Sequence, residues 1–277
     1  MPTLAPAKLN LCLFLGPRRE DGLHSLCSLF EPLALTDSIE ISEAARDEVL
    51  CPGLEGENLA ARALAGLRQR GWAHPPLRVE IEKRIPVAAG LGGGSADAAA
   101  ILRLAAGEIG GLEALAAEIG ADVPSQLVPA LALVRGAGEQ VERLPEPAPH
   151  AVVLLPAGGG LSTAAVFAEA DRLGLGRDPD ELDQLAGRIR GAAGGGASPL
   201  SYADLLANDL EPAARSLRPE IGESLDALRD AGAPVALVTG SGPTAFGLFG
   251  DLAEAERAAE RLNRDDAIVC AGGDTAP

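Results

Sequence analysis

A glycine-rich stretch is the feature of this sequence with the clearest chemical meaning. Four glycines fall within residues 90–94, and an alanine-rich segment follows. Glycine reaches positive φ values and lets a ligand approach the backbone, so successive N–H groups can converge on an anion. A helix that begins here adds the positive end of its dipole. The pattern predicts a phosphate-binding loop formed by Gly90, Leu91, Gly92, Gly93, Gly94, Ser95 and Ala96.

Two common nucleotide-binding motifs do not fit this stretch. A Walker A loop closes on Gly-Lys followed by Ser or Thr, and no such tripeptide closes this one. A dinucleotide fingerprint that started at Gly90 would need a glycine where Ser95 stands. A flexible strand-to-helix turn is the alternative, but such a turn needs only one or two glycines. A second glycine turn, at 238–247, makes a binding function more specific than either turn alone.

Lys8 and Asn10 lie two residues apart in an apolar N-terminal segment. Leucines alternate with other residues at positions 9, 11, 13 and 15, which predicts a half-buried strand. Both polar residues then project from the face opposite the leucines. A lysine on such a strand must reach solvent, pair with an acid or line a cleft. An exposed strand face without function is the alternative that the local sequence leaves open.

Asp122 lies between Gly120, which marks the end of a predicted helix, and Pro124. An aspartate at such a place can cap the next helix, with the proline in its first turn. Its carboxylate could instead accept the proton of an attacking alcohol, while a nearby ammonium ion keeps it ionised. Spacing alone does not bring Lys8 and Asp122 together, so both interpretations stay open.

Strand and helix patterns alternate along the chain and must position these residues. Residues 77–83 alternate as a strand, and 57–71 form an amphipathic helix with Asn58 as a candidate N-cap. Residues 96–108 form a second helix that is rich in alanine. The mixed order predicts an α+β fold.

A proline-rich segment divides the chain. Three prolines within residues 144–150 indicate a linker or a domain edge. We therefore predict two lobes, 1–148 and 149–277, with a ligand cleft between them. A glycine-rich gap at 191–198 predicts a mobile loop within the second lobe.

Composition excludes several classes of protein. Of the 277 residues 47% are apolar, which excludes disorder, and the formal charge is −17. No basic run is present, so we expect neither nucleic-acid binding nor docking to anionic membranes. No apolar run reaches the roughly eighteen residues that span a bilayer. Scattered cysteines and three isolated histidines predict reduced thiols, a cytoplasmic setting and no structural metal site.

Three ordered segments, 5–11, 86–99 and 239–247, together resemble the GHMP small-molecule kinases. The resemblance implies a two-lobed GHMP kinase fold, with an S5 domain 2-like N-terminal lobe and a ferredoxin-like C-terminal lobe. Further segments resemble the family members that act on methylerythritol linked to cytidine diphosphate: 18–24, 57–59, 120–124, 135–139 and 208–211. For those members the family implies transfer of the γ-phosphoryl group of ATP, with Mg²⁺, to the 2-hydroxyl.

The resemblance also implies a role for each candidate residue. Asp122 would be the general base and Lys8 its electrostatic partner. The remaining roles are Asn10 on the sugar alcohol, Asn58 and Lys83 near the adenosine, Ser95 near Mg²⁺, and Leu23, His24, Thr163 and Phe167 around the cytosine. From the local sequence alone, His24 could equally be a surface residue in a turn, and Phe167 a core residue.

Two positions depart from the family pattern. Leu23 stands where the family usually has a tyrosine that stacks on the cytosine. Leucine loses an aromatic contribution of roughly 0.5–1.5 kcal/mol, so we expect weaker substrate binding with the same chemistry. Ser125 and Gln126 replace the usual aromatic pair after Asp-Val-Pro. The packing of the loop that carries Asp122 is therefore not predicted by the resemblance.

Two alternative functions stay open at this level. One is another GHMP kinase, acting on homoserine, mevalonate or a sugar, although a cytosine-reading segment at 18–24 would be superfluous there. The other is a catalytically silent GHMP-fold binding protein, because fold alone does not imply activity. The retention of Lys8, Asp122 and the glycine loop argues against a silent protein. We expect a monomer or a weak homodimer.

Overall fold

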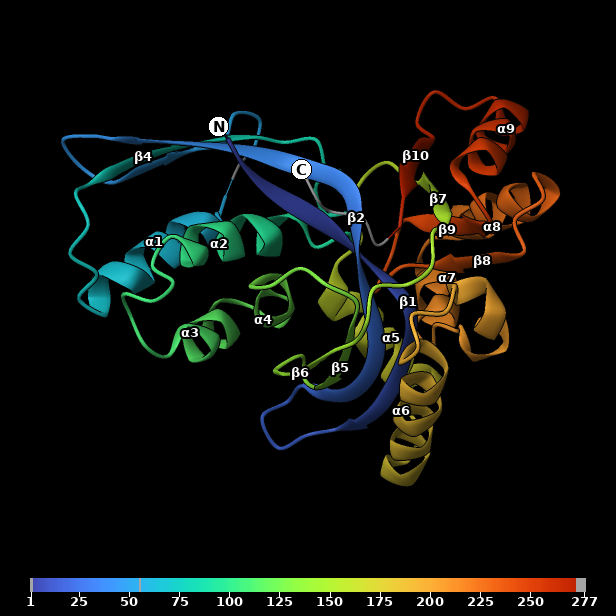
Figure 1. The fold of residues 1–277 in the computed structure, drawn as a ribbon. Helices are drawn as coiled ribbons and strands as arrows, with labels where there is room; N and C mark the ends of the chain where they lie inside the picture. The colour runs from blue at the N-terminus through green and yellow to red at the C-terminus, as the bar shows by residue number, and fades with distance from the viewer. Residues whose placement is uncertain (1, 55, 273–277) are drawn as a thin grey trace.

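A long antiparallel strand pair forms the frame of the molecule. The structure is a computed structural model and describes residues 2–54 and 56–272. β1 (Thr3–Arg18) and β2 (His24–Glu43) pair along most of their length. Their register shifts between Pro6 and Lys8 and again between Asn10 and Cys12. Such bulges bend a strand and change the direction of its side chains. The segment that carries Lys8 and Asn10 therefore lies between two irregularities of the strand pairing. Figure 1 shows the pair as a curved ribbon running through both halves of the molecule.

The first sheet is built on β2. Its strand order is β3-β4-β2-β5-β6, with β1 paired to β2 off this path. The β3–β4 pair is parallel, and the other pairs are antiparallel. The added strands are β3 (Glu48–Leu50), β4 (Leu77–Glu82), β5 (Ala132–Gly136) and β6 (Gln140–Arg143). The alternating burial of β4 confirms the strand predicted there.

Alanine-rich helices cover one side of this sheet. α1 (Leu59–Gln69) begins at Asn58, whose side chain accepts a hydrogen bond from the Ala60 N–H. α2 (Gly93–Arg103) packs against α1 through small buried side chains, which allow close approach of the two helices. α2 begins three residues before the predicted helix, inside the glycine loop. α3 (Leu112–Ile119) and the single turn α4 (Val123–Gln126) complete the group. Figure 1 shows α1 and α2 beneath β4 and β2.

The second sheet is antiparallel, with the order β10-β7-β9-β8. In chain order its strands lie fourth, first, third and second, which is the ferredoxin-like arrangement. The strands are β7 (Ala151–Leu155), β8 (Val235–Val238), β9 (Ala245–Phe249) and β10 (Ile268–Ala271). α8 (Glu220–Asp230) packs on β8 and β9, and α9 (Leu252–Leu262) packs on β7 and β10. The predicted α+β GHMP kinase fold is confirmed, and it contains two sheets.

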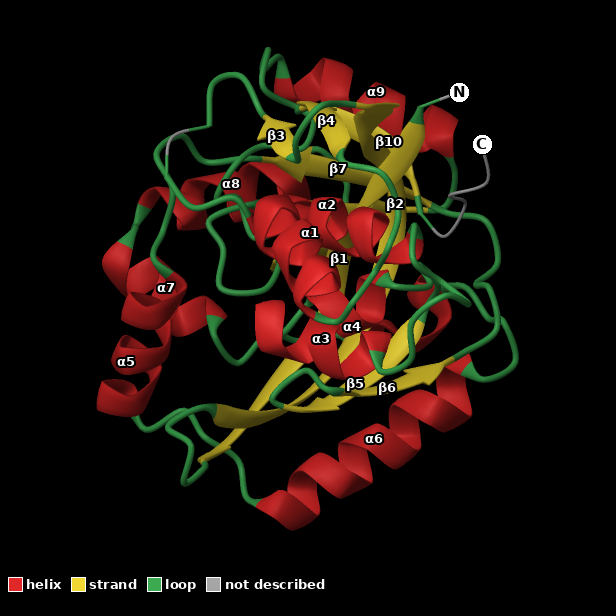
Figure 2. Ribbon diagram, turned by 90° about the vertical axis from the view of Figure 1, so that its left-hand side faces the viewer, coloured by secondary structure: helices red, strands yellow, loops and turns green. Residues whose placement is uncertain are grey.

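The two halves share one of the hydrophobic clusters of the molecule. The remaining helical elements are α5 (Thr163–Leu173), α6 (Pro179–Ala193), the 3₁₀ helix η1 (Pro199–Leu205) and α7 (Glu211–Leu217). α6 packs against β1, β2 and β5 of the first sheet, and Figure 2 shows it across β5 and β6. Side chains of β1, β7, β9 and α6 meet in a single buried cluster. A division between residues 148 and 149 stays a prediction.

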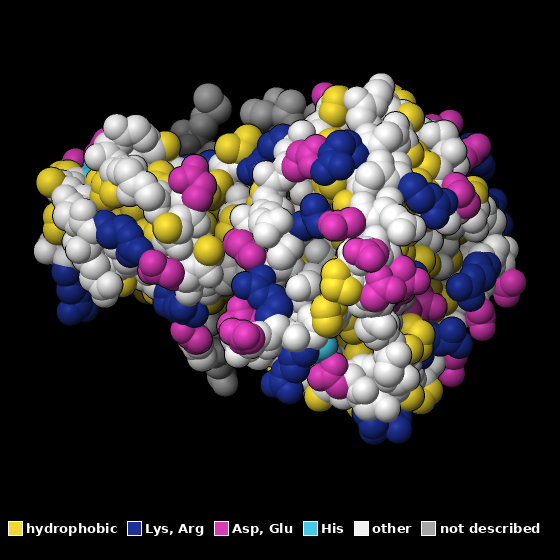
Figure 3. Space-filling view, turned by 90° about the horizontal axis from the view of Figure 1, so that it is seen from below, with side chains coloured by type: hydrophobic (Ala, Val, Ile, Leu, Met, Phe, Trp, Pro, Cys, Tyr) yellow, Lys and Arg dark blue, Asp and Glu magenta, His cyan; other side chains and the backbone are white. Residues whose placement is uncertain are grey.

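The surface carries both signs of charge. On the face seen in Figure 3, lysine and arginine side chains are interspersed with aspartate and glutamate. Surface ion pairs include Arg190 with Glu142 and Arg264 with Asp266. Within residues 2–54 and 56–272, no helix combines the length and the apolar character needed to cross a bilayer.

Candidate active site

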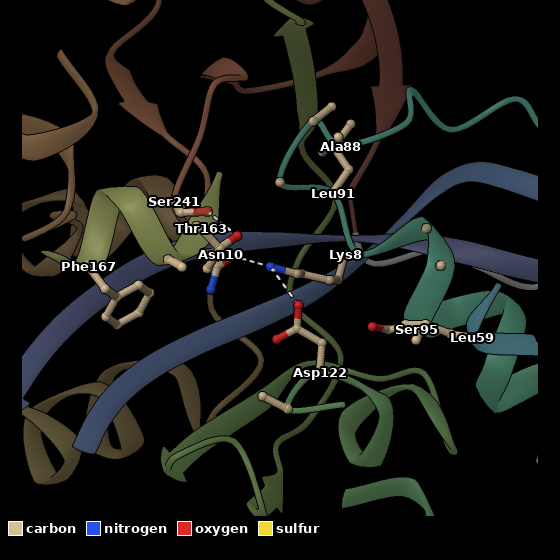
Figure 4. Close-up of a pocket in the computed structure, with 18 of the residues that line it drawn as sticks. Lys8, Asn10, Leu59, Ala88, Leu91, Ser95, Asp122, Thr163, Phe167 and Ser241 are labelled. Carbon is tan, nitrogen blue, oxygen red and sulfur yellow. Dashed lines mark hydrogen bonds and ion pairs between the residues drawn. The ribbon is translucent and has the colours of Figure 1, made fainter. Parts of the chain in front are cut away.

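A cleft of about 980 Å³ brings together the residues singled out in the sequence. Its walls come from β1, the glycine loop, the turn before α4, and α5. Figure 4 shows Lys8 and Asp122 in the middle, with Ser95 on one side and Phe167 on the other. Two ends of the cleft therefore flank a central pair of opposite charges.

Lys8 and Asp122 meet, although they are far apart in the chain. The Lys8 Nζ lies 3.3 Å from Asp122 Oδ2 and donates a hydrogen bond to Asn10 Oδ1 at 2.5 Å. The same ammonium lies 4.8 Å from the centroid of the Phe30 ring. Lys8 has a side chain only 7% exposed, whereas that of Asp122 is 32% exposed. A cleft therefore contains a fixed positive charge beside a carboxylate that a substrate can reach.

Asp122 does not cap α4. It occupies the N-cap position, but its side chain accepts no hydrogen bond from the helix. Its backbone carbonyl is held instead, because the Ser125 hydroxyl donates to it at 2.7 Å. The capping alternative of the sequence analysis is therefore wrong, and the Asp122 carboxylate is available for another role.

Asn10 is held on three sides. Its side-chain amide donates to Ser28 Oγ, its carbonyl oxygen accepts from Lys8, and its backbone N–H donates to Thr239 Oγ1. Thr239 belongs to the second glycine turn, which lies between β8 and β9 as predicted. A Cβ added at Gly240 would lie 3.1 Å from Asn10 Oδ1 and 3.5 Å from Lys8 Nζ. The second glycine turn therefore packs directly against Lys8 and Asn10.

The glycine loop makes equally close contacts. A Cβ at Gly90 would lie 2.8 Å from the Thr239 carbonyl oxygen, and one at Gly92 would lie 2.7 Å from Lys8 Cγ. Both glycines have positive φ, at 80° and 68°. The loop leads into α2, whose first N–H groups have no partner in the helix and lie beside the cleft. Ala96 lies outside the cleft lining, fully buried, and its N–H bonds to the Gly92 carbonyl. The phosphate-loop prediction is thus supported from Gly90 to Ser95 by geometry.

Lys83 lies beneath this loop and is already paired. Its ammonium bonds to Asp37 Oδ2 and to Asp97 Oδ2, and both carboxylates are nearly fully buried. Burial raises the pKa of Asp97 to about 6, although the Lys83 charge acts in the opposite direction. Burial acts to lower the pKa of Lys83, but the two carboxylates outweigh it and raise that pKa. Asp37 also accepts the N–H groups of Arg84 and Ile85, so the cluster anchors the start of the loop to β2.

The opposite end of the cleft is lined by one face of α5. Thr163, Phe167 and Asp171 are spaced four residues apart and all line the cleft. The His24 ring lies 5.5 Å from that of Phe167, centroid to centroid, and its Nε2 lies 3.2 Å from Asp171 Oδ1. The His24 Nδ1 lies 3.1 Å from the Gly16 carbonyl oxygen. His24 is thus buried in the cleft wall, which excludes the surface alternative.

Leu23 and Phe167 differ in exposure at this end. The Leu23 side chain is 55% exposed and lines the cleft. Phe167 is half-buried, and it packs on the core below while lining the cleft above. Phe167 therefore packs on the core and is also open to the cleft, and its role toward a base stays a prediction.

Three contributors escaped the sequence analysis. Asp171 could have been found from its four-residue spacing after Thr163 and Phe167. Ser241, whose hydroxyl lies 3.0 Å from that of Thr163, belongs to the second glycine turn that was already singled out. Asp37 carries no local signal, because it is an acid in the middle of an ordinary strand. Its contact with Lys83 arises only through the β2–β4 pairing.

Comparisons with known proteins agree with this geometry. The GHMP kinases N terminal domain matches residues 58–129, and the GHMP kinases C terminal model matches 198–267. A 4-diphosphocytidyl-2-C-methyl-D-erythritol kinase of Streptomyces avermitilis is 40% identical, over 93% of this chain and 90% of its own length. One of Pelotomaculum thermopropionicum is 41% identical, over 95% and 94%.

Solved structures give the same result. A crystal structure of 4-(cytidine 5'-diphospho)-2C-methyl-D-erythritol kinase superposes with a TM-score of 0.80 at 36% identity, covering 99% of this chain and 100% of that one. The mevalonate kinase of L. major reaches a TM-score of 0.70 at only 15% identity, covering 100% and 97%. At that identity the likeness concerns the fold alone.

Proposed function

The chain belongs to the 4-diphosphocytidyl-2-C-methyl-D-erythritol kinases of the GHMP family, and we propose how its cleft performs their reaction. The chain transfers the γ-phosphoryl group of ATP to the 2-hydroxyl of 4-diphosphocytidyl-2-C-methyl-D-erythritol, in the non-mevalonate route to isoprenoid precursors. The observation that carries the mechanism is the contact between Lys8 and Asp122 beside the glycine loop.

Asp122 acts as the general base. The oxygen of the 2-hydroxyl forms a bond to the γ-phosphorus, and the bond from that phosphorus to the bridging oxygen breaks. The electron pair leaves with ADP, and the hydroxyl proton passes to Asp122. The Lys8 ammonium stabilises the negative charge that spreads over the transferring oxygens. Asn10 fixes the direction of that ammonium, because its own amide is held by Ser28.

The glycine loop holds the triphosphate. Free N–H groups at the start of α2 and positive-φ glycines give the loop an anion-binding geometry. Mg²⁺ bound to ATP would neutralise charge on the phosphate oxygens. Hard oxygen donors suit this ion, and the Ser95 hydroxyl and the Asp122 carboxylate both line the cleft. Within the described part of the chain, no cluster of three His, Cys, Asp or Glu side chains could hold a metal ion, so most ligands would be phosphate and water.

The two ends of the cleft take the two nucleotides. The adenosine lies near Asn58, which lines the cleft while capping α1. Lys83 lies near this end of the cleft in a structural role. Its ammonium is held by two carboxylates. The cytosine lies at the other end, between the Leu23 side chain and the Phe167 ring, with His24 and Thr163 beside it. Asp171 adds a hydrogen-bond acceptor there, which suits the exocyclic amine of cytosine.

A panel of acceptors tests this function. Purified protein with ATP and Mg²⁺ would be offered the cytidyl substrate, mevalonate, homoserine and galactose, and ADP release would be followed. Release with the cytidyl substrate alone is the expected result. Release with another alcohol would favour a different GHMP kinase, and release with none would favour a silent binding protein.

For the cellular setting we propose the cytoplasm. Cys12, Cys27, Cys51 and Cys270 are free, which is consistent with a reducing cytoplasm. We propose a monomer or weak homodimer, which sedimentation of the purified chain would test.

A further inference from the structure

Arg103, the last residue of α2, binds backbone carbonyls of two other elements. Its Nη1 donates to the Gln126 carbonyl oxygen at 2.8 Å, at the end of α4, and its Nη2 donates to the Leu4 carbonyl oxygen at 3.0 Å, on β1. β1 also carries Lys8, and Asp122 is the N-cap residue of α4. One guanidinium therefore joins the helix that begins in the glycine loop to the two elements that carry the central pair of charges.

The Arg103 side chain is half-buried and has no acid to balance its charge. Burial lowers the pKa of Arg103, and no carboxylate of the described residues acts in the opposite direction. A cation in such a place loses part of its hydration, and hydrogen bonds to protein groups must compensate for that loss. The position of this side chain therefore depends on the two carbonyls that it binds.

The short helix α4 is fixed at its C-terminal end by arginines from elsewhere in the chain. The last carbonyls of a helix have no partner within it, and α4 is a single turn. Arg103 binds the carbonyl of Gln126, and Arg143 Nη2, from β6, lies 3.5 and 3.4 Å from those of Pro124 and Ser125. The Arg103 bond is the shortest of the three, so it contributes most to holding this end of the turn.

The strand β1 is held at two points by α2 and the loop before it. The Lys8 backbone N–H donates to the Leu91 carbonyl oxygen at 2.9 Å, just before α2 begins, and Arg103 binds the Leu4 carbonyl from the far end of the helix. β1 shifts its register on β2 between Pro6 and Lys8, so the strand pairing is irregular there. The position of Lys8 relative to the glycine loop therefore depends on α2 as well as on β2.

From these contacts we infer that Arg103 is a positioning residue, which holds the turn carrying Asp122 and the strand carrying Lys8 against the helix of the glycine loop. Arg103 does not line the cleft, so it acts through these two residues. A guanidinium suits this task, because its two Nη atoms donate in fixed and different directions, whereas an ammonium offers a single nitrogen. The inference rests on the proposed function, since the positioned carboxylate is the proposed general base.

Kinetics of two Arg103 variants test the positioning role. Arg103→Met keeps the apolar stem and removes both donors, and we expect kcat to fall roughly 10- to 100-fold because the base is misplaced. The KM for ATP should stay nearly unchanged, since the glycine loop lies at the other end of α2. Arg103→Lys keeps the charge and one donor nitrogen, so its kcat should lie between those of Arg103→Met and wild type. An unchanged kcat in Arg103→Met, or a kcat in Arg103→Lys that is no higher than in Arg103→Met, would overturn the inference.

Arg261 offers a matched control away from the cleft. This residue of α9 donates through Nε and Nη2 to the Ala231 carbonyl oxygen, at 3.1 and 2.5 Å, and Ala231 ends α8. Arg261→Met therefore removes the same kind of bond to the end of a helix, and neither Arg261 nor Ala231 lines the cleft. It should lower the melting temperature and leave kcat unchanged. An equal fall of kcat in Arg261→Met and Arg103→Met would mean that kcat follows general stability, which would overturn the positioning role.

Hydrogen exchange separates this inference from the proposed function, because it needs no activity. The backbone amides of residues 122–127 should exchange faster in Arg103→Met than in wild type, and at the wild-type rate in Arg261→Met. Unchanged exchange in Arg103→Met would overturn the inference even if the chain is an active kinase. An inactive wild-type chain would contradict the kinase assignment, and exchange would still show whether Arg103 holds the turn. If Arg103→Met did not fold, the kcat and the exchange of Arg103→Lys, compared with wild type, would decide the question.

Discussion

Two lysines lie close to the glycine loop, and the structure uses them in opposite ways. Lys8 faces one carboxylate, that of Asp122, which is 32% exposed, and it lies in the middle of the cleft. Lys83 faces two carboxylates, of Asp37 and Asp97, whose side chains are 0% and 6% exposed. The first centre leaves a reactive oxygen accessible, whereas the second satisfies its charges internally. A lysine beside a phosphate loop is therefore not by itself a phosphate ligand.

Replacing Asp122, the acid that faces Lys8, should have the largest effect on catalysis. Asp122→Asn removes the proposed general base without changing size, and we expect kcat to fall about 10²- to 10⁴-fold with ATP affinity nearly unchanged. Thermal unfolding serves as the control, and the melting temperature should shift little, because the Asp122 side chain is partly exposed and does not cap α4. A kcat within a few-fold of wild type would contradict the assigned role.

Replacing each lysine in turn tests whether Lys8 serves catalysis and Lys83 serves stability. Lys83→Met leaves two buried carboxylates without their cation, and we expect a loss of about 3–5 kcal/mol in the free energy of unfolding. Lys8→Met should abolish phosphoryl transfer while costing much less stability, because its single acid can reach solvent. Urea unfolding and ADP release, measured on both variants, give the two readouts. Equal stability losses would mean that the two centres do not differ as described.

The pH dependence of stability should report the Lys83 centre. Asp97 has a pKa of about 6 in the folded chain, above its ordinary value, so the folded state binds this proton more tightly than the unfolded state. The resulting stabilisation is present below about pH 4 and is lost as the pH rises through 6. The Asp97→Asn variant has no such carboxyl and does not lose this stabilisation. Its free energy of unfolding, relative to that of wild type, should therefore increase between pH 4 and 7 by on the order of 3 kcal/mol.

The control for this pH series is Asp226→Asn. Its carboxylate is 72% exposed and pairs with Arg229 on the surface of α8. Urea unfolding of that variant should follow the wild-type pH profile throughout. A flat difference between Asp97→Asn and wild type would show that Asp97 is ionised as easily as a surface acid.

The smallest effect is expected at the end of the cleft proposed to bind cytosine, away from both lysines. Leu23→Tyr restores an aromatic ring at an exposed position of the cleft. A stacking gain of roughly 0.5–1.5 kcal/mol should lower the KM for the cytidyl substrate about 2- to 10-fold. The KM for ATP and kcat should stay the same, which separates this end from the Lys8 centre. An unchanged substrate KM would exclude Leu23 from the base-binding surface.

Much of the fold was predictable because its signals are local. Alternating leucines gave β1, alternation over residues 77–83 gave β4, and Asn58 marked the start of α1. The glycine loop was predicted for the same reason, although α2 begins at Gly93 rather than at Ala96. The loop predicted at 191–198 begins later in the structure, because α6 continues to Ala193. Helix ends depend on caps and on tertiary contacts, which a residue pattern does not specify.

The amino-acid sequence alone determined which residues could do chemistry: glycines that allow close approach of a phosphate, two strand lysines, and an aspartate after a helix. Tertiary structure alone decided which acid each lysine faces. Those partners lie on β2, α2 and the turn before α4, and only strand register and helix packing bring them within hydrogen-bond distance. Charge interactions depend on separation and burial, and neither can be read from positions along a chain.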